Sequence, residues 1–256
     1  KTSSFAVKKA IELDPNYASS YATLARIQSQ QRNFIEADNT MKKALALDYT
    51  HSYINAVAAS NAMFSGNLAL ALSYREKVKD IDPKYFHNYY GIGLIHFFDN
   101  NMDKALKAFQ EYEKYNPNKD ALNYMISAVL LNQGQTELAY EYAQKETDDF
   151  WKNYAMNLVL IAQNKQIEAD KLLMAFINRY QNSDLANIAR IYAFRGEIDK
   201  SFEWLEKAFN HPDSTLIHVL NFPDFRKMHF DTRWHDLIRK MKFPDNHWLV
   251  KKLPQS

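Results

Sequence analysis

The 256-residue chain has 46% hydrophobic and 24% charged residues, the balance of a folded protein with a sizeable core rather than of a disordered segment. Only 5 Gly and 7 Pro stand against 16 Phe, 16 Tyr and 4 Trp. Because β-sandwiches and phosphate-binding loops need many turn residues, this composition favours helices joined by short connections. The absence of cysteine excludes disulfides, a thiol nucleophile and thiolate metal sites.

The charge balance, 32 Lys and Arg against 30 Asp and Glu, is too even for nucleic-acid binding by bulk electrostatics. The longest nearly apolar run, residues 155–162, is far shorter than the ~20 residues of a bilayer-spanning helix. We therefore expect neither direct nucleic-acid binding nor a membrane span in this region. Since the chain opens with Lys1 and shows no signal-peptide core, we expect a part of a longer protein, in the cytoplasm or, if that protein is membrane-anchored, the periplasm.

Rare residues recur along the chain at a fixed interval. Pro15, Pro83 and Pro117 lie 68 and 34 residues apart, and alanines keep the 34-residue interval at 37, 71, 105 and 139. Gly66 and Gly134 differ by twice that interval. Such a period indicates a helix-turn-helix unit that buries its apolar face only by stacking on its neighbours.

The repeated unit resembles the tetratricopeptide repeat family. Residues 86–119 match the family pattern best, with Tyr89, Ile92, Gly93, Ala105, Phe109 and Pro117 at the places of its aromatic, Leu, small, Ala, aromatic and Pro residues. Residues 18–51 and 52–85 match at fewer places. The resemblance implies an all-α, right-handed α-solenoid of about six such helix pairs with a C-terminal helical cap.

In chain order, the expected array covers residues 1–215. Residues 1–15 fit only the second helix of a truncated repeat, and full units follow at 18–51, 52–85, 86–119, a shortened 120–149, 150–181 and 182–215. Residues 216–244 are expected to form the cap and 245–256 a tail. The cap looks like the closing segment after such repeats in bacterial multidomain regulators, which implies a module of a signalling or transcription-regulating protein.

Three local patterns predict how each unit is built. Small residues on first helices (Ala25, Ala59, Gly93) and second helices (Ala37, Ala71, Ala105) allow close helix approach. The pairs Asp14-Pro15, Asp82-Pro83 and Asn116-Pro117 are expected to cap a new helix whose first turn holds the proline. Left-handed residues are expected inside each pair, at Gly66, Asn100, Gly134, Asn164 and Gly196.

In the cap, five apolar residues are expected to cover the exposed face of the last repeat: Phe225, Phe230, Trp234, Leu237 and Met241.

No catalytic pattern is present in the sequence. It contains no phosphate loop, GxSxG or HExxH motif, and His87 and His96 are nine residues apart, which does not place them on one helix face. His229, Asp231 and His235 are closer together but lie within the expected cap. We therefore expect no enzyme activity, no metal and no cofactor, with a pH-responsive cap built from these histidines as a minor alternative.

The family resemblance implies that the first helices line a concave face where partners bind. Its inner-face places hold Tyr53, Tyr90, Leu94, Phe97, Phe98, Tyr124, Leu131, Trp151, Tyr154 and Ile161, with Arg26 and Arg190 towards the ends. Tyr90, Tyr124 and Tyr154 predict a ladder of tyrosines, which suits capture of an extended peptide. Packing between helices is the alternative, above all for Phe97 and Phe98, whose bulk favours burial.

The carboxylate clamp of the chaperone-binding family members is not matched. Its places hold Ala22, Arg26, Val57, Tyr90 and Gly91, of which only Arg26 is cationic. One exposed charge does not replace capture by several donors, so an acidic chaperone tail is disfavoured as the partner. No role for Gly91 follows from the sequence.

These observations predict a non-catalytic scaffold that binds a protein or peptide in an aromatic groove. One alternative is a sensory domain that binds a small ligand or responds to pH and signals to an effector domain; another is a homo-oligomerisation platform. The tail is either disordered or occupies its own groove or that of a neighbouring chain, where it competes with the partner.

Overall fold

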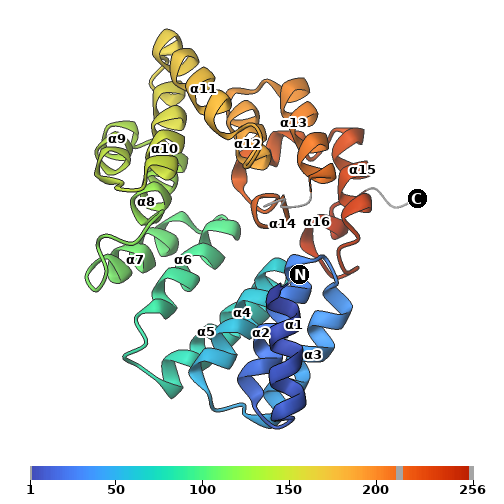
Figure 1. Ribbon diagram of the computed structural model, residues 1–256. Coiled ribbons are helices and arrows are strands. Elements are labelled where there is room, and N and C mark those ends of the chain that lie inside the picture. The colour runs from blue at the N-terminus through green and yellow to red at the C-terminus, as the bar shows by residue number, and fades with distance from the viewer. Residues whose placement is uncertain (1, 212–215, 254–256) are drawn as a thin grey trace. The chain divides into compact units, whose positions relative to one another are not determined.

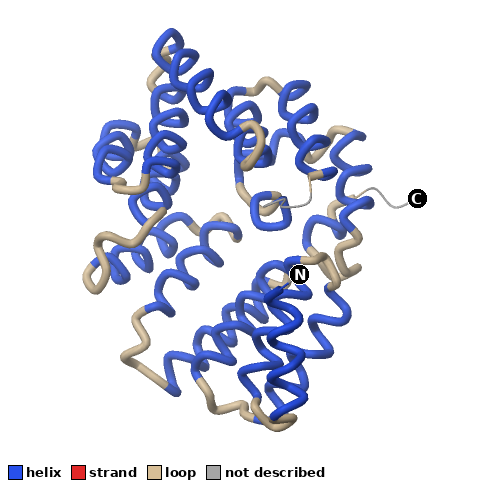
Figure 2. The backbone as a smooth tube through the Cα atoms, in the orientation of Figure 1, coloured by secondary structure: helices blue, strands red, loops and turns tan. Residues whose placement is uncertain are grey.

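The computed structural model describes residues 2–211 and 216–253, and all regular structure in these ranges is helical (Figure 2). Four residues of the expected repeat 182–215 and the last three of the tail lie outside this description. Within it, no helix has the length and the apolar composition needed to cross a membrane.

The helices follow one another as antiparallel pairs after a single first helix, α1 (Thr2–Leu13) (Figure 1). The pairs are α2 (Ala18–Gln30) with α3 (Phe34–Leu47), α4 (Ser52–Phe64) with α5 (Leu68–Ile81), α6 (His87–Phe98) with α7 (Met102–Glu113), α8 (Leu122–Asn132) with α9 (Thr136–Lys145), α10 (Asp149–Ala162) with α11 (Gln166–Tyr180), and α12 (Leu185–Arg195) with α13 (Ile198–Asn210). Shorter elements end the chain: α14 (Leu216–Val219), the 3₁₀ helix η1 (Pro223–Met228), α15 (Thr232–Met241) and α16 (Trp248–Lys251). This succession confirms the predicted all-α solenoid of helix pairs.

The chain forms two compact units. The first contains residues 1–95 and 234–256, and the second contains residues 96–233. In the first unit, α2 packs on α1, α3 and α4, and α4 packs on α5. In the second unit, α8 packs on α7, α9 and α10, and α12 packs on α13 and η1.

The turn inside each pair depends on one residue in the left-handed conformation. Gly66, Gly134 and Gly196 have φ values of 74°, 75° and 79°, and Asn100 and Asn164 have 64° and 58°, as predicted. Arg32, one period before Gly66, adopts the same conformation with φ 64°. After Gly66, the Asn67 N–H returns to the Ala62 carbonyl at 2.8 Å, which ends the helix.

The turns between pairs differ from the prediction. The side chains of Asp14 and Asp82 accept hydrogen bonds from the N–H groups two residues later, at 3.0 and 3.1 Å. These bonds form local Asx turns that precede the helix, so Pro15 lies in the turn and α2 starts only at Ala18. The placement of the prolines in the first helical turn was therefore wrong. Asp48 makes the same turn with the Thr50 N–H at 3.0 Å, although its unit lacks the proline.

The small residues of the first two pairs are buried, as their spacing requires. Ala25 and Ala37 in α2 and α3, and Ala59 and Ala71 in α4 and α5, have at most 1% of their surface exposed. A larger side chain at these positions would push the paired helices apart.

In the shortened repeat, a buried carboxylate accepts hydrogen bonds from main-chain N–H groups near two helices. Its first helix, α8, begins after Ala121, which has a φ of 67°. The buried Glu146 carboxylate accepts from the Tyr124 N–H at 3.1 Å and from the N–H groups of Thr147 and Asp148 at 3.0 and 3.2 Å. One side chain thus satisfies donors at the start of α8 and at the approach to α10, in the unit that lacks a closing proline.

The predicted cap is divided between the two units. Residues 216–233 group with the second unit, and residues from 234 onwards group with the first. Phe225, Trp234, Leu237 and Met241 are buried, whereas Phe230 is 91% exposed. The expectation that Phe230 covers an apolar face was therefore wrong.

Candidate partner-binding surfaces

In the second unit, a buried arginine lies among the helices that come first in each helix pair. Arg190 of α12 donates from Nη2 to the Tyr124 hydroxyl at 2.7 Å, from Nη1 to Asn187 Oδ1 at 2.8 Å, and from Nε to Asp224 Oδ2 at 2.8 Å. Burial opposes its charge, but Tyr124, Tyr154 and Asp224 outweigh this effect and raise the pKa of Arg190. Burial also raises the pKa of Tyr124 to about 12.

An aromatic cluster packs around this arginine. The Tyr124 ring stacks on Trp151 with centroids 4.8 Å apart and meets Tyr154 edge-on at 5.2 Å. Tyr154 also lies 6.0 Å from Phe176 of α11. The rings of Tyr124 and Tyr154 are therefore part of the core, stabilised by mutual packing rather than left available for a partner.

The chain's own segment 216–228, comprising α14 and η1, covers this face. The Phe222 ring lies 5.6 Å from Phe97 and 5.0 Å from Phe98, and the Arg190 guanidinium lies 3.6 Å from its centroid. Beyond it, Arg226 donates to Asn100 Oδ1 at 2.6 Å. Where the sequence predicted a groove in the second unit, the structure has an intramolecular contact.

This contact corrects five of the predicted groove residues. Phe97, Phe98, Tyr124, Tyr154 and Arg190 are buried and present no surface for a partner. Leu131, Trp151 and Ile161 in the same unit are half-buried. Phe222 and Asp224 lie within the expected cap, and nothing periodic in the sequence marks them as groove-filling residues.

The predicted groove residues of the first unit remain accessible. Arg26 is exposed, and Tyr53, Tyr90 and Leu94 are half-buried. The Tyr53 hydroxyl lies 3.4 Å from Thr23 Oγ1 of the neighbouring first helix. Both border an open hollow of about 400 Å³, which is lined by Val7, Tyr17, Ser19, Ser20, Thr23, His51 and Tyr53.

Gly91 receives a physical explanation here. The Arg75 guanidinium of α5 lies directly against its Cα, so that a methyl group at this position would overlap Arg75 Cζ. Arg75 stands one period before Phe109, at an aromatic place of the repeat. Its Nη2 donates to Ser60 Oγ at 3.2 Å, and burial lowers the pKa of Arg75 to about 10. Glycine at 91 therefore accommodates an arginine where the repeat usually has a ring.

The C-terminal segment packs on the turns of the first unit. Phe243 meets Phe34 at a centroid distance of 5.3 Å and stacks on His247 at 4.0 Å. The His247 ring lies against Gly66, at the C-terminal end of α4, where a Cβ would come within 2.5 Å of its Cγ. Tyr53 lies in the first turn of the same helix. The expectation that the tail lies in its own groove is therefore wrong for the described residues 245–253.

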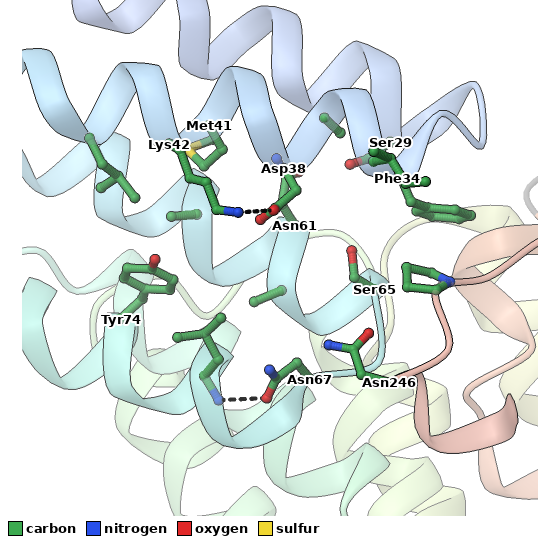
Figure 3. A pocket seen from close by; sticks show the side chains of 17 residues that line it. Ser29, Phe34, Asp38, Met41, Lys42, Asn61, Ser65, Asn67, Tyr74 and Asn246 are labelled. Carbon is green, nitrogen blue, oxygen red and sulfur yellow. Dashed lines mark hydrogen bonds and ion pairs between the residues drawn. The ribbon is translucent and has the colours of Figure 1, made fainter. Parts of the chain in front are cut away.

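A second cavity, of about 270 Å³, lies between α3 and α5 (Figure 3). Helix α4 lines it between them with Ala58, Asn61 and Ala62, and Pro244 and Asn246 of the C-terminal segment add to its wall. No sequence pattern predicts this cavity, because its lining comes from α2, α3, α4, α5 and the C-terminal segment.

The described ranges contain no cluster of three or more His, Asp or Glu residues that could bind a metal ion.

Comparison with known protein families finds two matches. Residues 6–39 and 86–119 each match a tetratricopeptide repeat family profile. No curated protein matches the chain in sequence.

Among solved structures, three with TM-scores above 0.5 are similar in fold to this chain. The type IV pilus biogenesis factor PilW is 15% identical, with a TM-score of 0.58 over 79% of this chain and 97% of its own. Pseudomonas aeruginosa PilF is 16% identical, with a TM-score of 0.57 over 76% and 86%. A tetratricopeptide repeat protein from Parabacteroides merdae is 13% identical, with a TM-score of 0.55 over 92% and 98%. At this identity the structures establish the fold alone, and the two profile matches identify tetratricopeptide repeats at residues 6–39 and 86–119.

Proposed function

We propose that this chain is a non-catalytic scaffold of a larger bacterial regulatory protein and that it binds a segment of a partner protein on the first unit. Tetratricopeptide repeats form scaffolds for protein–protein interaction. The observation that supports the location is the division of the predicted groove. Five of the eight predicted groove residues of the second unit are buried, whereas none of the four in the first unit (Arg26, Tyr53, Tyr90 and Leu94) is.

The chemistry of this surface suits an extended peptide. Tyr53 and Tyr90 each offer a flat apolar ring with a hydroxyl group and lose little entropy on binding. Thr23 and Tyr53 add hydroxyls that can bond to a peptide main chain, and Arg26 adds one positive charge. An extended segment with apolar side chains and a polar main chain fits this combination better than a globular face.

The test is affinity capture from the source cells with the full-length protein, followed by quantitative mass spectrometry. For the variant Arg26→Ala/Tyr53→Ala/Tyr90→Ala, the captured amount of each specific partner is expected to fall at least tenfold. Its helical circular dichroism spectrum should remain that of the wild type. Tyr49→Ala is the matched control, since Tyr49 is 63% exposed and lies outside the predicted groove. Retention of every partner by the triple variant rejects the location.

A further inference from the structure

Arg75 of α5 is a buried cation without a counterion. The residue is only 8% exposed, and its guanidinium donates one hydrogen bond, from Nη2 to Ser60 Oγ. Among the described residues, no carboxylate pairs with it. With a pKa of about 10, the group stays charged at neutral pH. A buried charge that nothing neutralises lowers stability, so packing alone does not account for an arginine at this position.

Two other arginines that are largely buried have their charge neutralised within the chain. Arg190 pairs with Asp224 at 2.8 Å, where the two side chains are 1% and 7% exposed. The Arg195 side chain, 11% exposed, pairs with two carboxylates, one of them Glu197 at 2.6 Å. Arg75 is buried to a similar depth but has a hydroxyl group where these arginines have a carboxylate. A bound anion would supply the charge that the chain does not.

One nitrogen of Arg75 remains open to such an anion. Nε is enclosed, whereas Nη1 has no partner in the described ranges and keeps accessible surface. The guanidinium lies between Ser60 of α4 and Gly91 of α6. Ser60 follows Tyr53 by about two turns on the same face of α4, and Gly91 directly follows Tyr90. The charge is therefore located between the two helices that carry Tyr53 and Tyr90.

The number of charges fits a carboxylate. A carboxylate carries one negative charge and accepts short, strong hydrogen bonds from a guanidinium. A phosphate group carries nearly two charges at neutral pH and would need a second cation. Within the described part of the chain, only burial and Tyr85 shift the pKa of Arg75, so no Lys or Arg adds a positive charge at this place.

We propose that Arg75 binds a carboxylate of the partner segment, with Nη1 donating to one carboxylate oxygen. This assignment rests on the proposed function, because the carboxylate belongs to the peptide that Tyr53 and Tyr90 hold. It adds an acidic group to that peptide, either an Asp or Glu side chain or the terminal carboxylate. Since the attraction between charges is stronger in a buried site than in water, Arg75 contributes more to this recognition than the exposed Arg26.

The first experiment titrates the full chain with capped amino acids and follows the Arg75 Nε–H signal by NMR, at constant ionic strength and without other carboxylates. N-acetylalanine carries a terminal carboxylate, N-acetylglutamate amide a side-chain carboxylate, and N-acetylalanine amide neither. A saturable shift is expected with a carboxylate probe and none with N-acetylalanine amide. The carboxylate probe that binds more tightly identifies the source of the carboxylate in the partner. No saturable shift with either carboxylate at millimolar concentration, or tighter binding of methyl phosphate, overturns the assignment.

Arg75→Met separates binding from a structural role. Replacing an uncompensated buried charge with an apolar side chain should leave the melting temperature unchanged or raise it. The affinity for the carboxylate probe and the captured amount of each partner should both fall at least tenfold. Arg195→Met is the matched control, because it removes a largely buried guanidinium that carboxylates already neutralise, and it should retain wild-type binding. Wild-type probe affinity in Arg75→Met overturns the site.

Failure of the carboxylate site and failure of the proposed function give different results. If Arg26→Ala/Tyr53→Ala/Tyr90→Ala loses its partners while Arg75→Met keeps them, carboxylate recognition is wrong and the partner surface stands. If the triple variant keeps every partner while Arg75→Met loses the carboxylate probes, the partner surface is wrong and the carboxylate site serves a different ligand.

Discussion

At the residue scale, Gly91 and Arg75 act as one packing unit. Replacing Gly91 with Ala places a methyl group against the Arg75 guanidinium, which Ser60 holds by a hydrogen bond of 3.2 Å. Because overpacking a tight contact costs about 1 to 3 kcal/mol, Gly91→Ala is expected to lower the free energy of unfolding by that amount in urea titrations.

The origin of that loss is tested in an Arg75→Met background. Methionine is flexible and uncharged, so Gly91→Ala should then cost less than half as much. Gly134→Ala reports the separate cost of a left-handed conformation, since its φ is 75° and nothing lies within 4 Å of an added Cβ. Equal losses from Gly91→Ala in both backgrounds would contradict the contact.

His247 makes the stability of the first unit depend on pH. Burial lowers its pKa from 6.5 to about 4, while the Phe64 carbonyl acts weakly in the opposite direction. In the unfolded chain, the His247 imidazole is protonated near pH 6.5, whereas in the folded chain it stays neutral down to about pH 4. The free energy of unfolding therefore falls as the pH drops between these values. At ~1.4 kcal/mol per pKa unit, the loss reaches about 3 kcal/mol.

His247→Gln should flatten this part of the pH profile, measured as the urea midpoint from pH 7 to pH 4. His87→Gln, at an exposed position, should retain the wild-type slope. A slope unchanged by His247→Gln would show that other groups carry the acid sensitivity.

At the element scale, the pairing of Arg190 with Asp224 connects η1 to α12. The two side chains are 1% and 7% exposed, and Nη2 lies 2.8 Å from Oδ2. Asp224→Ala leaves a buried guanidinium without its carboxylate, which typically costs 3–5 kcal/mol. Asp231→Ala is the control, because its partner Arg233 is 48% exposed and such pairs contribute at most about 1 kcal/mol. Urea unfolding compares the free energies of unfolding of the two variants, followed by the fluorescence of Trp151, which stacks on Tyr124. Similar losses in both variants would contradict a buried ion pair.

The helix pairs were predictable because their signals are local and repeat. A left-handed φ at Gly66 or Asn100 depends on the residue and its place in the period, and the structure has both where the sequence predicted them. The Asx turns were partly missed, since Asp14 bonds to a main-chain N–H before the helix rather than inside it. At Arg75 the repeat pattern predicts a ring, and the compensating Gly91 lies 16 residues further on, where no motif connects them.

At the scale of the whole molecule, burial of the candidate groove depended on contacts that no repeat encodes. Tyr90 and Tyr124 stand at the same place of successive units, and the sequence gives no reason to treat them differently. Tyr124 is buried because Arg190, Trp151 and Tyr154 enclose it, and Arg190 in turn is covered by Phe222. The period therefore predicted which residues share a face, and non-local packing decided which of them remain accessible.

The two ends of the chain belong to one unit, because residues 234–256 group with residues 1–95. Deleting residues 243–256 removes Phe243 from Phe34 and His247 from Gly66. Exposure of these contacts should speed amide hydrogen exchange at the start of α3 and at the α4–α5 turn, while exchange in α10 stays unchanged. Lys251→Ala is the control, since this exposed side chain is not part of the packing, and it should leave exchange in both units unaltered. Faster exchange in α10, or none in α3, would show that the C-terminal segment does not stabilise the N-terminal repeats.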